Sequence, residues 1–386
     1  MKKKILILSG VIPAIGRGGG CLALHRHFVE RSDFDAVVAG ASLQNGTAQH
    51  QVNLESQEGL ARLQRTRFRR FFVNFQILLS WILLPRMLHK LIREFRPDYI
   101  FTVPDNLHLG WAWIASRKYR IPLTVNFQDL FPISRFLPES DRPYRWVTRI
   151  LMRKFHHAAK QSEVVFYTSE GMQQFFSTGK KGRVLYPVGE RIEIQPEVST
   201  DPESVKTIVY AGNCYGAYGR MLLPLARELE NNSQVRLKIF TAGNDWPKED
   251  QDYFRAKGVL LGFRPFEELK SEFQTATAFL TVMSFEESER DFVRTSFTTK
   301  WLDYAPFGKP VFAWAPSYSS AAIFARKYDC GFVLDVEDTS EVLLIFMRCL
   351  EDAGKRQKFA EASLRVAQSV LHADQIHTIL KTGLDA

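Results

Sequence analysis

Short apolar runs, each bounded by turn-forming residues, alternate along the chain with longer segments of helical periodicity. Runs of this length with little polar alternation are typical of strands that a parallel sheet buries on both faces. They are KILILSG, DAVVAG, DYIFTV, PLTVNF and EVVFYTS in the first half, followed by TIVYAG, VRLKIFTAG, GVLLGF, AFLTVM, KPVFAWA and CGFVLDV. The pattern predicts an α/β fold throughout, with helices crossing between parallel strands.

A chain of 386 residues is too long for one ordinary hydrophobic core, so we expect two domains. The segment QPEVSTDPESV is rich in Pro, Ser, Thr and acidic residues, which is typical of a linker. It places the boundary between Pro196 and Lys206, with domains over 1–196 and 206–370 and a closing helix over 371–386. We expect two Rossmann-like, doubly wound parallel sheets that face each other across a cleft, where a ligand binds beyond the carboxyl ends of the strands.

The net charge of +9 favours an anionic partner, and charge alone does not choose among a nucleotide, a nucleic acid and an acidic membrane. The four cysteines are scattered without a close pair, which disfavours a zinc or redox motif and fits a reducing cytoplasm. The apolar part of MKKKILILSG is too short for a signal peptide, and the longest nearly apolar segment, Phe71 to Leu84, is shorter than a spanning helix. We therefore expect no membrane crossing.

Two glycine-rich loops follow predicted strands and precede predicted helices. In the first, Gly16, Gly18, Gly19 and Gly20 would let backbone amides approach a phosphate or sugar. The spacing does not fit G-x-G-x-x-G and no acid ends the second strand, so a nicotinamide cofactor is disfavoured and no cofactor is expected. A loop without a ligand is the alternative.

The second loop, AGNCYGAYGRM, offers Gly212, Gly216, Gly219 and Arg220 to a diphosphate. An ordinary turn between a strand and a helix would have the same composition.

The stretch RTSFTTKWLDYAPFGKPVFAW gathers hydroxyl groups and a lysine before a predicted helix. If the helix begins near Thr298, then Ser296, Thr298 or Thr299 can cap it, and Lys300 adds a positive charge beside the free amides. Asp303 would share a face with Lys300 and could accept hydrogen bonds from ribose. The alternative is a capped amphipathic helix with a solvated lysine and aspartate.

These residues resemble the donor-site segment of family 4 glycosyltransferases, especially bacterial polysaccharide enzymes with the pattern Ser-x-Pro-Ser/Thr-Lys-x-x-Glu-Tyr-x-x-x-Gly-Lys-Pro. The residues in register are Thr299, Lys300, Tyr304, Gly308, Lys309 and Pro310. FQDLFPISRFLPES, which is followed by a basic helix and TSEGM, resembles a motif of the family's first domain. GVLLGFRPFEEL, which contains Phe263 and Arg264, resembles the segment that precedes the donor site.

The resemblance implies a GT-B fold, with an acceptor-binding first domain and a second domain that binds a nucleoside diphosphate sugar. It implies a retaining transfer without an essential metal to a lipid-linked or polysaccharide acceptor, in which Lys300 and Arg220 stabilise the leaving diphosphate. The implied donor-binding residues are Gly212, Asn213, Gly216, Phe263, Arg264, Ser296, Thr298, Thr299 and Asp303. A non-catalytic sugar-nucleotide-binding protein and a sugar-nucleotide epimerase of the same fold remain open.

On the acceptor side, Asp129 could orient or deprotonate a hydroxyl, or could cap a turn. His108 and Gly18 to Gly20 are further acceptor-side candidates, although a lone histidine is often structural. The DFD sequence at Asp33 to Asp35 is interpreted as a turn before the second strand, so no metal site is predicted.

The chain departs from the family pattern at several positions. Asp303 replaces the usual Glu, and Thr295 stands where a longer motif has its first carboxylate, for which Glu286, Glu287 or Glu289 could compensate. Pro306 should shorten or kink the helix. Of the usual Arg and Lys pair after the second glycine loop, Arg220 alone remains.

Residues 62–98 combine many Lys and Arg with an aromatic and aliphatic stretch, and only Glu94 and Asp98 are acidic. The segment suits a helix pair whose apolar face enters an anionic membrane surface, with Trp81 and the Phe cluster near the head groups. A core helix with a solvated basic face is the alternative. No RNA-recognition module accompanies the charge, so nucleic acid is not an expected partner. We expect a cytoplasmic protein attached to the inner membrane face.

Overall fold

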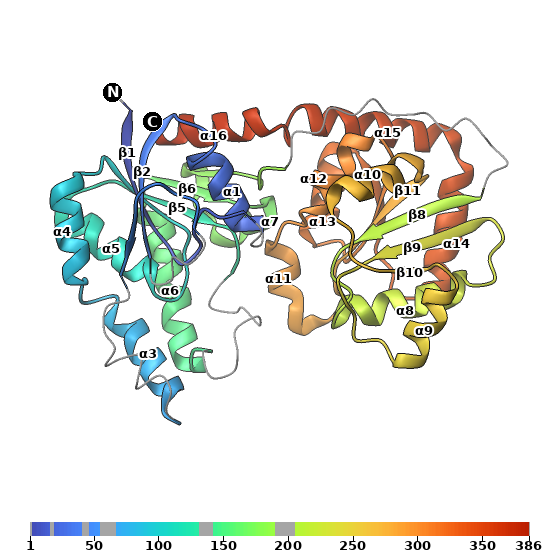
Figure 1. Cartoon of the computed structure of the whole chain (residues 1–386), viewed down its shortest axis with the longest axis horizontal. Helices are drawn as coiled ribbons and strands as arrows, with labels where there is room; N and C mark the ends of the chain where they lie inside the picture. The colour runs from blue at the N-terminus through green and yellow to red at the C-terminus, as the bar shows by residue number, and fades with distance from the viewer. Residues whose placement is uncertain are drawn as a thin grey trace. The chain divides into compact units, whose positions relative to one another are not determined.

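The computed structural model describes residues 2–15, 19–40, 46–54, 67–130, 142–189 and 205–385. The chain divides into two compact units, Met1–Val188 with Ile376–Ala386, and Gly189–Gln375 (Figure 1). Most of the linker expected between Pro196 and Lys206 lies outside the described residues. The expected closing helix is α16, Ala373–Asp385, and most of it belongs to the first unit.

The first unit contains a seven-stranded sheet whose strands are all parallel, in the order β3-β2-β1-β4-β5-β6-β7. The strands are β1 Lys3–Leu8, β2 Phe34–Gly40, β3 Gln51–Asn53, β4 Tyr99–Thr102, β5 Leu123–Phe127, β6 Val164–Tyr167 and β7 Gly182–Val184. The sequence did not predict β3 and β7, because each has three residues and none of these six residues is fully buried. Without an apolar run, such edge strands leave no periodic signal.

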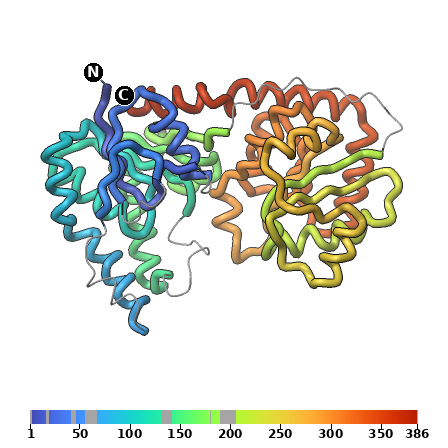
Figure 2. Tube along the Cα trace, in the orientation of Figure 1, coloured from blue at the N-terminus to red at the C-terminus, as the bar shows by residue number. Residues whose placement is uncertain are grey.

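Helices cover both faces of this sheet. They are α1 Gly19–Phe28, α3 Arg69–Leu79, α4 Arg86–Phe95, α5 His108–Tyr119, α6 Arg145–Gln161, α7 Glu170–Phe176 and α16. On one face, Phe127 packs with Phe155 of α6 in a core that also includes residues of α3, α4 and α5. On the other face, Phe28 of α1 packs edge-on against Phe101, and Gly383 of α16 lies against Phe166. The two ends of the chain meet here, as the trace in Figure 2 shows, and Lys3 forms an ion pair with Asp385.

The second unit contains a six-stranded parallel sheet in the order β10-β9-β8-β11-β12-β13. The strands are β8 Lys206–Ala211, β9 Val235–Phe240, β10 Leu260–Leu261, β11 Ala278–Val282, β12 Val311–Trp314 and β13 Gly331–Leu334. The helices are α8 Ala217–Leu229, α9 Lys248–Ala256, α10 Phe266–Thr275, α11 Arg290–Thr295, α12 Lys300–Tyr304, α13 Ser320–Tyr328, α14 Thr339–Glu351 and α15 Ala353–Gln368. The prediction of two doubly wound α/β units is confirmed.

The strand order positions the site of the second unit. The chain winds outward from β8 through β9 to β10, then returns to β11 on the other side of β8. The strand order thus reverses between β8 and β11, and the loops that leave these two strands run in opposite directions. Doubly wound sheets bind ligands at this switch point in the strand order. The glycine loop follows β8, and the hydroxyl-rich segment follows β11.

The helix after that segment is shorter than its apolar pattern suggests. Helix α12 ends at Tyr304 and continues as a 3₁₀ turn, Ala305–Phe307, which contains Pro306. Gly308 then ends the turn with a positive φ of 58°. Pro306 has no amide hydrogen to continue the helical ladder, so the predicted shortening is confirmed. The described helices include none with the length and hydropathy of a membrane-spanning segment.

Candidate functional site

Lys300 begins α12, and its side chain lies across the end of β8. Its Nζ is 5.0 Å from the centre of the Tyr210 ring. A β carbon on Gly212 would lie 2.5 Å from Cε and 2.7 Å from Nζ of Lys300. Any side chain at position 212 would therefore displace the lysine, so Gly212 and Lys300, two predicted donor-site residues, form one structural unit.

The Lys300 amine has no ion-pair partner among the residues that the structure describes. Burial lowers the pKa of Lys300 to about 8, although the Asp303 carboxylate partly opposes this shift. Among the described residues, no carboxylate forms an ion pair with Nζ and no acceptor forms a hydrogen bond with it. A desolvated lysine of this kind would be stabilised in its charged form by a bound anion, which is a common property of functional sites.

Tyr304 lies one helical turn after Lys300 and also contacts the end of β8. Its hydroxyl accepts a hydrogen bond from the Ala211 amide at 2.8 Å and lies 3.3 Å from the Ala211 carbonyl, to which it donates. Its ring stacks on Phe279 with centroids 4.4 Å apart. The i, i+4 spacing of Lys300 and Tyr304 therefore places both side chains on the strand that leads into the glycine loop.

The predicted hydroxyl cap of α12 is wrong. Thr299 occupies the N-cap position with helical φ and ψ of −65° and −13°, and its side chain makes no capping hydrogen bond. A residue that is already helical cannot direct its hydroxyl back to the first amides. The Thr298 hydroxyl instead lies 3.2 Å from that of Thr281 in β11, and the Ser296 carbonyl accepts a hydrogen bond from Ser320 in α13. These contacts fix the loop to its own unit.

The glycine loop carries a carboxylate that the sequence did not point to. Gly216 has a φ of 61°, and its amide donates to Oδ2 of Asp245 at 2.7 Å. A β carbon on Gly219 would lie 2.6 Å from the Cys214 carbonyl oxygen and would also meet the Asp245 carboxylate. Asp245 follows β9, the neighbour of β8. Its position after an adjacent strand is the one feature of the sequence that could have indicated its contact with the glycine loop. Asn213 serves the loop itself, since its Oδ1 accepts from the Tyr215 amide at 3.2 Å.

Arg220, on the first turns of α8, forms an ion pair with Glu286, which follows β11. Both side chains remain substantially exposed, at 61% and 42%. They line a cavity of about 380 Å³ between α8 and the ends of β11 to β13, which Ser284, Trp314 and Asp338 also line. Of the carboxylates proposed to compensate at this segment, Glu286 thus meets Arg220, whereas Glu287 pairs with Arg290 at 3.0 Å.

Other residues of this region are held by local contacts. The buried Thr295 hydroxyl donates to the Asp291 carbonyl within α11 at 2.7 Å. Arg264 binds Glu272 at 3.0 Å and lies over the Phe240 ring, whereas Phe263 is 71% exposed. The structure therefore brings Lys300, Gly212 and Tyr304 together, and it uses Arg264 for packing.

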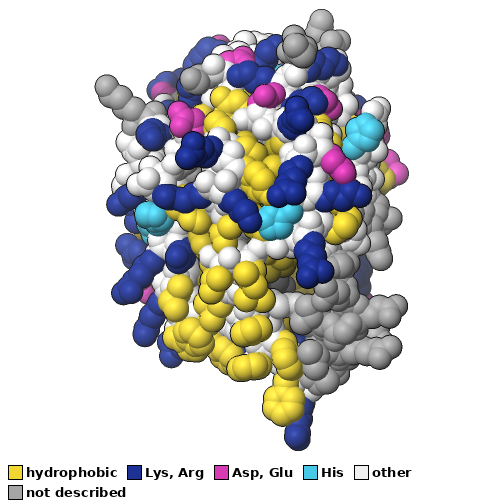
Figure 3. Space-filling model, turned by 90° about the vertical axis from the view of Figure 1, so that its left-hand side faces the viewer, with side chains coloured by type: hydrophobic (Ala, Val, Ile, Leu, Met, Phe, Trp, Pro, Cys, Tyr) yellow, Lys and Arg dark blue, Asp and Glu magenta, His cyan; other side chains and the backbone are white. Residues whose placement is uncertain are grey.

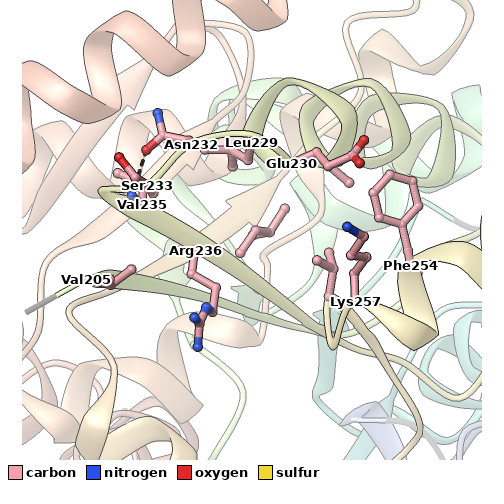
Figure 4. Close-up of a pocket in the computed structure, with 12 residues that line it drawn as sticks. Val205, Leu229, Glu230, Asn232, Ser233, Val235, Arg236, Phe254 and Lys257 are labelled. Atoms are coloured by element: carbon pink, nitrogen blue, oxygen red, sulfur yellow. Dashed lines mark hydrogen bonds between the residues drawn. The ribbon is translucent and has the colours of Figure 1, made fainter.

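A second cavity, of about 260 Å³, lies at the amino ends of β8 and β9 (Figure 4). Its polar side chains carry opposite charges on Glu230, Arg236 and Lys257. The Asn232 side chain closes the turn there by accepting from the Val235 amide at 2.8 Å. Because Lys300 lies at the carboxyl ends of the strands, this cavity is not part of the candidate donor site.

In the first unit, the loop after β5 meets the start of α1. A β carbon on Gly20 would collide with Oε1 of Gln128, the residue before the exposed Asp129. Gly19 and Gly20 are the first residues of α1, whereas Gly18 and Gly16 lie outside the described residues. The structure thus brings the start of α1, at Gly20, beside the loop that carries the predicted Asp129.

His108 is buried beside Asp105, which the sequence did not single out. Its Nδ1 lies 2.7 Å from Oδ2 of Asp105, whose other oxygen accepts from the amides of Leu107 and His108 at 2.8 and 2.6 Å. Burial alone would raise the pKa of Asp105, but His108 and the backbone amides lower it below its usual range. Since Asp105 also accepts from Gly10 at 3.0 Å, it joins the loop after β1 to α5. Asp105 could have been found in the sequence as an aspartate just before a predicted helix, where it can cap the first amides.

No metal-binding cluster was predicted. Within the described ranges, no three His, Cys, Asp or Glu side chains are placed to hold a metal ion. Asp33, the first residue of the DFD sequence, binds Lys381 at 2.7 Å and His377 at 3.1 Å, both in α16. This aspartate therefore fixes α16 to the first unit.

Comparisons with known proteins agree with this architecture. Residues 21–187 match the model of Glycosyltransferase Family 4, which covers most of the first unit. No curated protein sequence is significantly similar to the chain. Lys300, Gly212 and Tyr304 lie outside the matched residues.

Solved structures share the fold over nearly the whole chain. Sucrose-phosphate synthase from Thermosynechococcus elongatus is 12% identical, with a TM-score of 0.65 and coverage of 99% of this chain and 98% of that chain. A glycosyltransferase from Rickettsia africae is 11% identical, with a TM-score of 0.64 and coverage of 100% and 98%. The lipopolysaccharide outer core galactosyltransferase WaaB is 13% identical, with a TM-score of 0.61 and coverage of 99% of each chain.

Identities this low show the shared fold alone, and the family match applies to residues 21–187. Both units have a doubly wound parallel sheet, and in the sequence a glycine-rich segment follows the first strand of each. The chain has the GT-B fold, and its residues 21–187 match Glycosyltransferase Family 4.

Proposed function

We propose that the protein transfers a sugar from a nucleoside diphosphate sugar to a lipid-linked or polysaccharide acceptor. The observation that carries this proposal is the placement of Lys300, whose amine lies against Gly212 and Tyr210 and has no ion-pair partner in the described part of the chain. It lies beside the switch point of a doubly wound sheet, where such folds bind nucleotides. A diphosphate there would supply the missing negative charge.

Lys300 would stabilise the charge that develops on the leaving diphosphate, which is electrostatic catalysis by a preorganised group. Arg220 would add a second cation once the diphosphate replaced Glu286 as its partner. Two cations at the leaving group allow a transfer without a metal, and we propose retention of the anomeric configuration. Asp303, on the same short helix, would bind the ribose hydroxyls.

The acceptor would bind at the first unit. Asp129 is exposed at the carboxyl end of β5 and could orient or deprotonate an acceptor hydroxyl. His108 would act through Asp105 as a positioning residue, because its side chain is only 4% exposed.

We propose a cytoplasmic location at the inner membrane face. All four cysteines are free, which fits a reducing compartment. A lipid-linked acceptor would be presented at that membrane.

A protein that binds a sugar nucleotide without turning it over is the second candidate. Asp245 holds the Gly216 amide and Glu286 holds Arg220, so two groups that would bind a diphosphate already have carboxylate partners. A donor would have to displace at least one carboxylate, which weakens its binding.

One experiment separates these possibilities. The purified protein is incubated with a panel of nucleoside diphosphate sugars, and the products are followed by chromatography. Free sugar with the nucleoside diphosphate supports a transferase, an altered intact sugar nucleotide indicates an epimerase, and binding without turnover indicates a binding protein. Lys300→Ala should abolish either signal, whereas Lys248→Ala, at a 78% exposed lysine, serves as the matched control. Unchanged kinetics in Lys300→Ala would contradict the donor-site assignment.

A further inference from the structure

Eight large apolar side chains are exposed on the first unit, in and just before α3, in the turn between α3 and α4, at the start of α4, and in α6. They are Phe68, Phe71, Phe75, Ile82, Leu83, Met87, Trp146 and Ile150, which we name the aromatic patch. Figure 3 shows hydrophobic side chains gathered at one end of this face, with Lys and Arg around them. Monomeric proteins rarely expose large apolar patches, and such patches commonly mark an interaction surface.

Helix α3 has more apolar surface than the core requires. Asn74 and Ile77 face the protein and are buried, whereas Phe71 and Phe75, one turn apart, are 56% and 52% exposed. Ile82, in the turn after α3, is 70% exposed. These side chains contribute little to the packing of the unit, so their exposure has no structural explanation within it.

Helices α3 and α6 are joined, so their exposed side chains form one surface. Oδ1 of Asn74 accepts from the Tyr144 amide at 2.8 Å, and Arg70 donates to the Arg142 carbonyl at 3.2 Å. The Arg70 guanidinium also lies 4.8 Å from the centre of the Tyr144 ring. Tyr144 directly precedes α6, so the contacts of Tyr144 hold the start of α6, which includes Trp146, beside α3.

The helices that carry the aromatic patch are rich in basic residues. Residues 67–93 and 142–161 contain Lys and Arg at twelve positions and no Asp or Glu. These are Arg67, Arg69, Arg70, Arg86, Lys90, Arg93, Arg142, Arg145, Arg149, Arg153, Lys154 and Lys160. Arg145, Arg149 and Arg153 are exposed, and none of them pairs with an acid among the described residues.

We propose that the aromatic patch inserts into the head-group region of an anionic phospholipid bilayer. Aromatic and aliphatic side chains enter the interface, and the surrounding arginines bind the anionic head groups. A second copy of the chain is a poor occupant, because two such surfaces would bring like charges together. The inference rests on this surface and is independent of the donor chemistry.

The structure corrects the helix pair expected from the sequence. The apolar face of α4 belongs to the core, with Leu88 and Ile92 at 0% and 3% exposure. Trp81 also packs on the core, with the Lys154 amine 5.3 Å from its ring, so it does not lead the contact with head groups. The bilayer surface is formed by α3, the following turn, Met87 at the start of α4, and α6, and α6 lies outside the predicted segment.

The test is sedimentation of the full chain with vesicles of phosphatidylcholine alone or with about 30% phosphatidylglycerol. We expect strong binding only to the anionic vesicles, reduced at about 0.5 M salt. Phe71→Ser with Phe75→Ser should lower the partition into vesicles at least tenfold, because the serine side chains bury much less apolar surface in the bilayer interface. Arg149→Gln with Arg153→Gln should lower it about fivefold per charge at low salt.

A matched control uses α14 of the second unit. Leu344 is 64% exposed and Arg348, one turn later, is also exposed, so Leu344→Ser with Arg348→Gln removes similar groups from another surface. This variant should bind vesicles like the unaltered chain. The single variant Ile82→Ser, at a position that adds nothing to the core, keeps the test valid if the double phenylalanine variant folds poorly.

Several results would overturn the proposal. Equal binding to neutral and anionic vesicles would show that anionic head groups do not contribute to binding. Unchanged partition of Ile82→Ser and of the arginine variant would show that the aromatic patch is not the surface that binds the bilayer. Absence of vesicle binding, with self-association that the patch variants abolish, would assign the patch to a second copy. Donor hydrolysis measured without vesicles should be equal in all patch variants, so failure of the sugar-transfer proposal and failure of this one give different results.

Discussion

The Nζ atom of Lys300 lies 2.7 Å from the position that a β carbon on Gly212 would occupy, which is closer than van der Waals contact allows. The lysine after β11 and the glycine after β8 therefore depend on each other, although 88 positions separate them. This dependence leads to the first prediction.

Gly212→Ala should weaken nucleoside diphosphate binding by about tenfold or more, because the new methyl group displaces the Lys300 amine. Isothermal titration with nucleoside diphosphates measures the effect. Gly354→Ala in α15 is the control, since its nearest neighbour is a carboxylate oxygen at an ordinary 3.5 Å. Equal affinity of the two variants would show that Lys300 does not bind the donor.

Donor binding should take up a proton above pH 8. The free amine has a pKa of about 8, and a bound diphosphate raises it, so the dissociation constant should increase up to about tenfold per pH unit above that value. Titrations in buffers of different ionisation enthalpy count the protons. Lys300→Arg should lose this dependence, since a guanidinium stays charged at these pH values. A flat pH profile in the unaltered chain would contradict the role of Lys300.

Tyr304→Phe should lower the free energy of unfolding by about 1 to 3 kcal/mol, because both backbone groups of Ala211 lose a partner at a buried site. The stacking on Phe279 is retained, so the fold should survive. Urea denaturation measures the loss. Tyr253→Phe, at a tyrosine that is 42% exposed, should have little effect on the free energy of unfolding. Comparable losses in both variants would show that the hydrogen bonds between Tyr304 and the Ala211 backbone do not stabilise the fold.

Glu286→Gln and Arg220→Gln should act in opposite directions on donor affinity. The first removes a carboxylate that competes with the diphosphate for Arg220, so binding should strengthen several-fold, whereas the second removes a cation and should weaken it. Stability should change by less than about 1 kcal/mol in either variant, since the pair is exposed. If both variants weaken binding, Glu286 contacts the donor rather than competing with it.

Acid should destabilise the first unit through His27. Burial, followed by the charges of His377 and Arg31, lowers the pKa of His27 from 6.5 to about 3. The unfolded state therefore binds a proton that the folded state does not, and the free energy of unfolding falls as pH drops from 6.5 toward 3, by up to about 1.4 kcal/mol per pH unit. His27→Phe should flatten this slope in urea denaturation between pH 7 and pH 4. A slope that His27→Phe does not alter would assign the acid sensitivity elsewhere.

The strands could be predicted because each buries a continuous apolar run. Strands β3 and β7 could not, since their three residues carry no such run and pair only at the sheet edges. The full extent of the aromatic patch could not be predicted from the sequence either, because it depends on a contact between distant segments. The contribution of Trp146 depends on Asn74 holding the chain before α6, a contact between segments 70 residues apart.

In the candidate site, the four-residue spacing of Lys300 and Tyr304 indicates a shared helix face, and both side chains contact the end of β8. The capping hydroxyls were predicted wrongly, because local pattern cannot tell whether Thr299 lies before the helix or already within it. Asp245 and Asp105 were missed for a different reason. Each meets its partners through loops of neighbouring strands, and that neighbourhood is known only once the strand order is known.

Helix α16 has a consequence for synthesis of the chain. It covers one face of the first sheet, where Gly383 meets Phe166 and His377 stacks on His27, yet it follows the entire second unit in the sequence. A nascent chain that has emerged as far as Val188 therefore still exposes that apolar face to water and to chaperones. The first unit can reach its final packing only after the second has been translated, so a fragment that ends at Val188 should aggregate where the full chain does not.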